Sequence, residues 1–142
     1  MSGKLFYRFD HRAIPPCSFG SNVGVVTSKM QTGSDGENLA AEYLTGKGYE
    51  VLERNYRVGR AEIDLIVRKG NWLIFVEVKT RSGSAFGFPE EFVDREKERN
   101  VLFAAEWYIE RVNWQGNVRY DIVAVLGVGW DREVTHFEDA FY

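Results

Sequence analysis

Two neighbouring stretches of the chain, residues 61–69 and 72–81, predict a pair of β-strands: apolar and polar residues alternate from Ala61 to Leu65, and residues 73–78 are apolar except for Glu77. The two residues between the stretches are Gly70 and Asn71, which favour the tight turn of a β-hairpin. We therefore expect the strands to pair antiparallel, with one face uniformly apolar and the other becoming charged away from the turn.

The two-residue turn sets the register of the hairpin, and this register places Asp64 opposite Glu77. Two positions further from the turn, Glu62 faces Lys79. The other face of the first strand carries three apolar residues: Ile63, Leu65 and Val67. Directly opposed side chains lie about 4.5–5.5 Å apart, so two carboxylates facing each other need a compensating charge.

A cation held between Asp64 and Glu77 would supply that charge. Lys79 can offset part of it, and magnesium is typically held by one or two carboxylates together with waters and substrate phosphates. The alternative interpretation is a solvated strand end with an ion pair between Glu62 and Lys79. We favour the functional cluster because the charges interrupt an apolar run, residues 73–78, that should be largely buried.

The rest of the pattern predicts two helices and three further strands: helices at about 35–47 and 89–112, and strands at about 49–56, 117–126 and 133–137. Because a helix separates strand 72–81 from strand 117–126, these two strands should be parallel. Apolar residues at helical spacing indicate that the aromatic residues of the long helix belong to the core. The expected fold class is α/β, with a mixed central sheet flanked by helices in the order α-β-β-β-α-β-β.

The chain has 142 residues, of which 44% are hydrophobic, and this suits one globular domain. Residues 1–30 contain adjacent prolines and no clear period, so we expect an N-terminal extension there, and the domain at 31–142. Met30 stands where the ordered pattern begins. No stretch approaches a membrane span or the apolar core of a signal peptide, so we expect a cytoplasmic protein without a membrane partner.

Composition narrows the chemistry further. A single cysteine, Cys17, excludes an internal disulfide framework, and with two histidines beside it the chain offers little for a structural zinc site. The net charge is −3, and the first 30 residues hold four basic residues and one acidic residue, so residues 31–142 carry −6. A nucleic-acid surface on the domain must therefore be local, because phosphate contacts supply most non-specific affinity.

Several blocks of sequence carry a family resemblance, and they run from Gly33 to Phe141. The blocks are Gly33-x-x-Gly36-Glu37-x-Leu39-Ala40-Ala41-x-Tyr43-Leu44, Arg54-Asn55-Tyr56-Arg57, Glu62-Ile63-Asp64-Leu65-Ile66, Phe75-Val76-Glu77-Val78-Lys79-Thr80-Arg81, Arg119-Tyr120-Asp121-Ile122-Val123 and Ala140-Phe141. In this order they resemble the uncharacterised YraN-like bacterial family. Those endonuclease-related proteins have a fold similar to that of the PD-(D/E)xK, or restriction-endonuclease-like, nucleases and the archaeal Holliday-junction resolvases.

The resemblance implies a catalytic site and its cofactor. Asp64, Glu77 and the carbonyl of Val78 would hold Mg²⁺ or Mn²⁺, and Lys79 would lie near the attacking water. Glu37, on the first helix, would complete the metal ligands. The metal lowers the pKa of bound water and neutralises the phosphate, and the lysine stabilises developing negative charge. No organic cofactor is expected.

Two of the residues singled out have rival explanations. Glu37 follows Ser34 in a capping-box pattern, in which the glutamate would reach back to the start of the helix. Lys97 falls where the family usually has a lysine and could bind phosphate, but a solvated helix face explains it as well. Three arginines flank the expected site as a local basic rim: Arg57, Arg60 and Arg81.

Two more residues stay outside the expected site. Asp121 either supports the site or caps a strand end, and His136 is expected to be structural. The leading hypothesis is metal-dependent cleavage of DNA or RNA, with a branched or processed structure as one class of substrate. The alternative is a non-catalytic module that binds nucleic acid or protein on a nuclease fold. A scaffold without a nucleic-acid role is a third option.

Overall fold

The computed structural model describes residues 28–81, 94–127 and 131–140, with side chains from residue 35 onward. The elements are α1 (Ser28–Gly46), β1 (Glu50–Val58), β2 (Ala61–Lys69), β3 (Trp72–Arg81), α2 (Arg95–Val112), β4 (Asn117–Leu126) and β5 (Glu133–Phe137). The expected N-terminal extension lies almost entirely outside the described residues.

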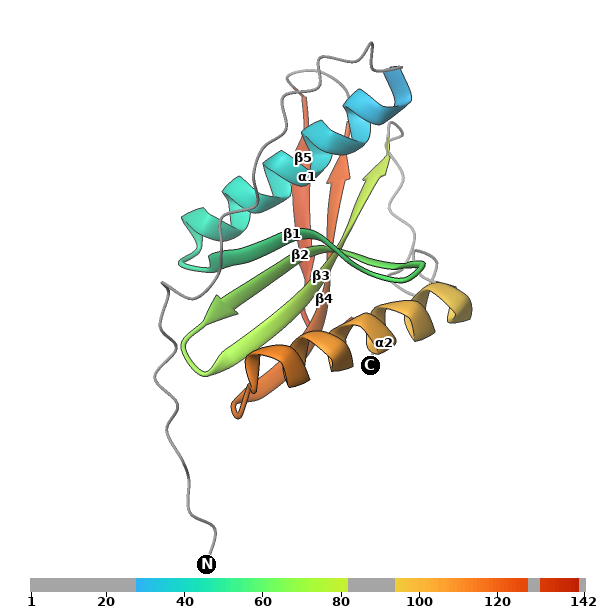
Figure 1. Ribbon diagram of the computed structural model, residues 1–142. Coiled ribbons are helices and arrows are strands. Elements are labelled where there is room, and N and C mark those ends of the chain that lie inside the picture. Colours follow the sequence, from blue (N-terminus) through green and yellow to red (C-terminus); the bar gives the residue numbers. More distant parts are fainter. Residues whose placement is uncertain (1–27, 82–93, 128–130, 141–142) are drawn as a thin grey trace, which may run out of the picture.

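The strands form one sheet in the order β1-β2-β3-β4-β5. Neighbouring strands are antiparallel except β3 and β4, which are parallel and joined through α2. Helices α1 and α2 cover opposite faces of the sheet (Figure 1). The predicted element order, the mixed sheet and the parallel pair are confirmed, and the architecture is consistent with a nuclease-like fold.

The sheet has an apolar cluster on each face. On the α2 side, buried residues of the helix lie against the odd-numbered positions of β3: Val101, Ala104, Ala105 and Tyr108 against Leu73 and Phe75 among others. On the α1 side the partners come from the other positions: Ala40, Ala41 and Leu44 against Ile74 and Val76 among others. Because side chains alternate along a strand, a β3 residue points to the face opposite to that of its two sequence neighbours.

The hairpin register near the turn agrees with the prediction. Lys69 pairs with Trp72, and the ladder continues to Leu65 and Val76. Gly70 has φ 58°, a conformation that the tight hairpin turns require and that glycine adopts without a steric penalty.

Both helices begin elsewhere than predicted. α1 starts at Ser28, seven residues before the expected start, because the helix continues through glycines that read as a loop in the sequence. Gly36 lies against Thr80 of β3 so closely that a Cβ at this position would overlap its side chain, so close packing explains the glycine inside a helix. α2 starts at Arg95 after the N-cap Asp94, whereas the predicted start, Pro89, lies outside the described residues.

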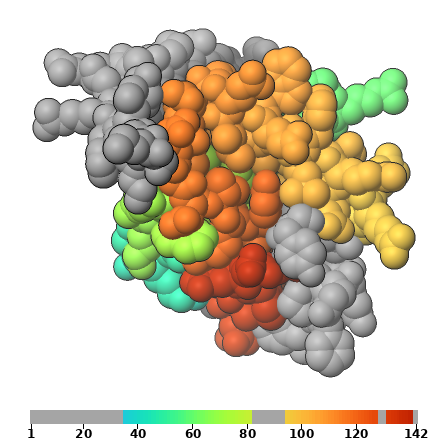
Figure 2. Space-filling view, turned by 90° about the horizontal axis from the view of Figure 1, so that it is seen from below, coloured from blue at the N-terminus to red at the C-terminus, as the bar shows by residue number. Residues whose placement is uncertain are grey.

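The aromatic residues of α2 do not all belong to the core. Tyr108 is fully buried, but Phe103 and Trp107 are 48% and 54% exposed, and the prediction is wrong for these two. Their rings contact each other on the outer side of the helix, with centroids 6.3 Å apart. Figure 2 shows α2 across this surface, with the turn between β1 and β2 projecting beside its first residues.

None of the helices in the described ranges is long and apolar enough to cross a membrane.

The contact between Gly36 and Thr80 gives a testable prediction for stability. Gly36→Ala should lower the free energy of unfolding by about 1–3 kcal/mol, because the added methyl group overlaps a stiff β-branched side chain. Gly46→Ala is the matched control, since a Cβ there meets nothing within 4 Å, and it should change stability by less than about 1 kcal/mol. Urea unfolding measures both. Equal stability of the two variants would show that α1 does not pack on β3 at this point.

Candidate functional site

β2 and β3 separate beyond the pair Leu65 and Val76, where their ladder ends. In an unbroken ladder of this register, Val78 would exchange backbone hydrogen bonds with Ile63. Instead, the Val78 N–H donates to Asp64 Oδ2 at 2.8 Å. The predicted direct pair of Asp64 with Glu77 is therefore wrong, and the Asp64 side chain occupies the fork between the two strands.

A bend in β1 and β2 explains the fork. Asn55 has φ 50°, a left-handed conformation that asparagine tolerates better than most residues, and it stands opposite Asp64 in the β1–β2 pairing. Beyond this bend Ile63 packs in the α2-side cluster, whereas Leu65 packs in the α1-side cluster. The prediction that both point to one face is wrong, because the bend turns this part of β2.

The peptide group of Val78 faces the fork. In an extended strand the N–H and C=O of one residue point to the same neighbour. Since the Val78 N–H points to Asp64, the Val78 carbonyl is also directed to the β2 side. It follows that a carboxylate oxygen and a carbonyl oxygen are available in the same opening.

Glu77 is the buried carboxylate of the site. It lies between Val76 and Val78, which join the α1-side cluster, so its side chain points to the α2 side. It is only 4% exposed, and the Lys79 ammonium lies 3.1 Å from its Oε1. The ion pair considered between Glu62 and Lys79 is not the one formed, because the strands have separated before these residues.

Lys97 reaches the same carboxylate from α2. Its ammonium lies 3.3 Å from Glu77 Oε2. That oxygen is buried and accepts no hydrogen bond from any described residue. The contact with Lys97 is therefore an ion pair that lacks the geometry of a hydrogen bond. The solvated helix face considered for Lys97 is not what the structure has, since the residue is half-buried against the site.

Glu37 approaches the fork from the α1 side. Asn55 Nδ2 donates to Glu37 Oε2 at 3.3 Å, so the residue that bends β1 also holds this carboxylate. Ser34 lies inside α1, so it is not the N-cap, and the capping-box explanation of Glu37 is wrong. The charge of Glu37 contributes to the raised pKa of Asp64, which places the two groups within electrostatic reach.

Asp64 has a strongly shifted pKa. Burial is the main cause, the charge of Glu77 adds to it, and together they raise the pKa of Asp64 to about 7. The hydrogen bond from Val78 and the charge of Lys97 act in the opposite direction. A buried carboxylate beside another carboxylate favours its neutral form unless a cation arrives.

The donor set suits a hard divalent cation held by few protein ligands. Asp64, Glu77 and the Val78 carbonyl are oxygen donors, and the unbonded Glu77 Oε2 leaves a buried acceptor without a donor among the described residues. No group of three or more His, Cys, Asp or Glu side chains in the described ranges is arranged to hold a metal ion. Glu37 comes from the opposite side of the sheet, so it is near the site without joining such a group.

The three predicted arginines lie around the site and differ in whether they form an ion pair. Arg57 pairs with Glu62 at 3.2 Å on the surface. Arg60 is exposed in the turn between β1 and β2, which projects beside the start of α2 (Figures 1 and 2). Arg81 is exposed at the end of β3. All three are on or beside strands that leave the fork.

Comparison with known proteins gives the family. The profile of the uncharacterised protein family UPF0102 matches residues 36–125. A UPF0102 protein of Rhodococcus opacus is 46% identical over 114 residues, which cover 79% of this chain and 97% of that protein. The chain belongs to UPF0102. A relative from Thermodesulfovibrio yellowstonii is 36% identical over 115 residues, covering 81% of this chain and 99% of its own length.

UPF0102 membership confirms the resemblance to the YraN-like family. The matched range contains the residues that the structure brings to the fork: Glu37, Asp64, Glu77, Lys79 and Lys97.

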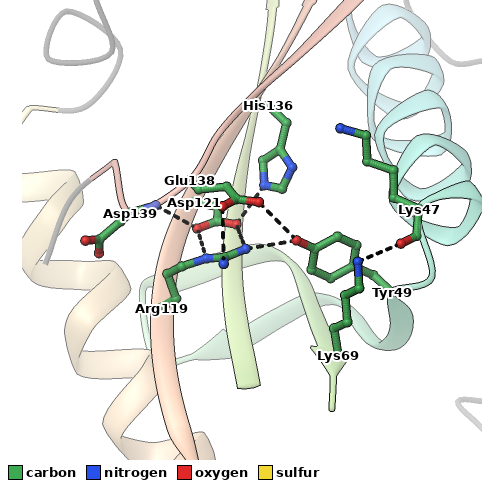
Figure 3. Close-up of polar contacts among 8 residues, drawn as sticks. All are labelled: Lys47, Tyr49, Lys69, Arg119, Asp121, His136, Glu138 and Asp139. Carbon is green, nitrogen blue, oxygen red and sulfur yellow. Dashed lines mark hydrogen bonds and ion pairs between the residues drawn. The ribbon is translucent and has the colours of Figure 1, made fainter. Parts of the chain in front are cut away.

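A second polar cluster of this UPF0102 chain lies on the α1 side of the sheet (Figure 3). Asp121 is fully buried and receives two hydrogen bonds from Arg119, both at 2.8 Å. His136 Nε2 lies 2.7 Å from Asp121 Oδ2, and the Asp139 N–H donates to Oδ1 at 3.0 Å. Arg119 also donates to the Tyr49 hydroxyl at 3.0 Å.

This cluster ties the last strand to the sheet. Burial raises the pKa of Asp121, but its hydrogen bonds, first from His136 and then from Arg119, outweigh burial, so the pKa lies below its ordinary value. Its partners lie on β4, on β5 and in the segment after β5, and His136 is one of them, whereas its expected structural role stays a prediction. Sequence reasoning missed Arg119 and Tyr49, although the spacing of Arg119 and Asp121 on one strand face was a usable signal.

The raised pKa of Asp64 predicts a pH-dependent effect of Asp64→Asn in metal-free protein. Because the folded state holds the proton more tightly than the unfolded state, Asp64 favours folding below about pH 4, and this contribution is lost as the pH rises to about 7. Asp64→Asn should therefore be more stable than the natural protein by about 1–2 kcal/mol at pH 8, with the difference much smaller at pH 5.

Thermal unfolding in EDTA at the two pH values measures this effect. Glu62→Gln is the matched control, since it neutralises a carboxylate of the same strand in a surface ion pair, and it should change stability by less than about 0.5 kcal/mol at either pH. A stability difference for Asp64→Asn that does not vary with pH would contradict the interpretation.

The Asp121 cluster predicts a large effect on stability. Asp121→Asn should destabilise the fold by about 2–4 kcal/mol, because it leaves the Arg119 guanidinium without its buried counter-charge. Glu138→Gln, which changes an exposed carboxylate 3.5 Å from the same guanidinium, should cost less than about 1 kcal/mol. Guanidinium-chloride unfolding compares the two, and similar losses would show that burial of Asp121 is not decisive.

Proposed function

We propose that this UPF0102 protein is a divalent-metal-dependent nuclease that hydrolyses phosphodiester bonds of DNA or RNA. The observation that carries the proposal is the fork, where Asp64 replaces a strand partner at Val78 beside the buried Glu77. Asp64 in that position interrupts the pairing of β2 with β3. Its burial beside a second carboxylate also disfavours its ionised form. Such an arrangement is typical of functional sites.

Each residue has a role that follows from its position. Asp64, Glu77 and the Val78 carbonyl would hold the cation, for which Mg²⁺ and Mn²⁺ both suit oxygen ligands. When bound, the metal lowers the pKa of a water molecule and neutralises the phosphate. Lys79, fixed by its ion pair with Glu77 at 3.1 Å, would stabilise the charge that develops on the phosphate oxygens.

The surface around the fork supports binding of a phosphate backbone. Arg60 and Arg81 are exposed near the site, and Arg57 needs only to leave a surface ion pair. Residues 31–142 carry a net charge of −6, so this local rim would have to supply the electrostatic attraction.

One observation favours a second candidate, a non-catalytic nucleic-acid- or protein-binding module. Glu77 already has a lysine at each oxygen, and the described residues contain no group of three metal-ligating side chains. A site that is neutralised without metal can be retained for binding alone.

A cleavage panel tests the proposal. The protein is incubated with linear, branched and single-stranded DNA and RNA. It should cut at least one of these substrates in the presence of Mg²⁺ or Mn²⁺ and none of them in EDTA. Asp64→Ala and Glu77→Ala should lose metal binding in calorimetry, and Asp64→Ala, Glu77→Ala and Lys79→Ala should each lower the cleavage rate by about 100-fold or more.

Lys47→Ala is the control, because this exposed lysine lies at the far end of α1, and it should cleave like the natural protein. Binding of nucleic acid at low salt without cleavage of any substrate would favour the binding module. Calorimetry that detects no metal on the natural protein would refute the mechanism.

A further inference from the structure

Glu77 receives its two lysines from different elements of the fold. Lys79 is on β3, two residues from Glu77, and its ammonium lies 3.1 Å from Oε1. Lys97 is on α2, and its ammonium lies 3.3 Å from Oε2. The two contacts therefore differ in how far each lysine can move without disturbing the strand.

The contact with Lys97 is the longer of the two and involves the buried oxygen of Glu77. Glu77 Oε2 is buried and has no hydrogen bond from the described residues, although the ammonium is close. An ammonium that is near but not aligned neutralises the charge without satisfying the acceptor. This oxygen therefore retains capacity for a ligand that aligns with it better.

The start of α2 fixes the backbone of Lys97 beside the site, whereas the side chain of Lys97 is partly exposed to solvent. Asp94 caps the helix by accepting a hydrogen bond from the Lys97 N–H at 2.7 Å, so the backbone of Lys97 is held in the first turn. Its side chain is 31% exposed, against 22% for Lys79. The long side chain can turn toward solvent without movement of the helix.

Once a divalent cation is bound, only one of these lysines or neither is needed to neutralise the carboxylates. Asp64 and Glu77 together balance Lys79 and Lys97, so the ionised site is neutral without metal. A divalent cation at the same carboxylates would leave two excess positive charges, and the nearest ammonium would be repelled. Lys97 is the one that is free to leave, because Lys79 is constrained by its strand.

We propose that Lys97 is an exchangeable counter-ion of Glu77, which neutralises the buried carboxylate until a divalent cation binds and is then released to bind the phosphate of the substrate. The inference rests on the proposed function. It adds an order of events, in which metal binding frees the Lys97 side chain and so precedes tight binding of nucleic acid.

Lysine labelling on the full chain tests the release directly. The protein is treated briefly with an amine-reactive ester, with and without Mg²⁺, and each lysine is quantified by peptide mass spectrometry. Mg²⁺ should raise the labelling rate of Lys97 by about three-fold or more, since the ion pair no longer protects it. Lys47, exposed at the end of α1, is the internal control and should not change.

Metal affinity tests the exchange from the other side. Lys97→Met should tighten binding of Mn²⁺ in calorimetry by about three- to ten-fold, because no ammonium has to be displaced, and Lys97→Arg should stay close to the natural protein. Lys79→Met removes the same charge from the other oxygen of Glu77 and should tighten binding less. Equal tightening in the two methionine variants would overturn the proposal, since general electrostatics would then explain both.

The outcomes separate this inference from the proposed function. If calorimetry detects metal and cleavage occurs while the labelling of Lys97 is unchanged, the counter-ion role is refuted and the nuclease stands. If the labelling of Lys97 rises with metal but no substrate is cut, the counter-ion role stands and the nuclease fails. The absence of metal binding to the natural protein would overturn both.

Discussion

The structure of the site depends on one constraint, the burial of the Glu77 carboxylate on the α2 side of the sheet. A charged group that is 4% exposed must be neutralised by its surroundings, because the interior solvates charge poorly. Two lysines from separate elements do this, at 3.1 Å and 3.3 Å. The position of α2 is thereby linked to β3 by charge as well as by the apolar contacts of the helix, and the start of the helix at its N-cap becomes part of the site.

The second feature follows from the sheet itself. A ladder that continued past Leu65 and Val76 would place two carboxylates directly against each other, and the strands separate instead. The separation leaves the Val78 peptide without a strand partner, and a buried N–H needs an acceptor. Asp64 provides it at 2.8 Å, while the left-handed Asn55 allows the bend. The same bend brings the Asn55 amide to Glu37, so one residue shapes the fork and positions a carboxylate beside it.

Much of the fold could be predicted because it is encoded in local patterns. The bounds of β2, β3, β4 and β5 agree with the alternation and the turn residues, and the hairpin register is correct near its turn, where two residues leave little freedom. The start of α1 could not be predicted, since a helix through Gly36 is explained by close packing on Thr80, which no local rule contains. The start of α2 had a signal in Asp94, but Pro89 and two following glutamates suggested an earlier one.

The sequence by itself determined the order of the elements, the turn of the hairpin and the candidate residues of the site, because period, turn chemistry and family motifs reside in the chain. Only the tertiary structure decided how the charges pair. Lys79 and Lys97 share Glu77, Glu62 pairs with Arg57, and Arg119 and His136 share Asp121. Such pairings depend on where strands separate and on which face a helix covers. Charged side chains are long enough to choose among several partners, so burial and geometry, and not their positions in the sequence, select the one that forms.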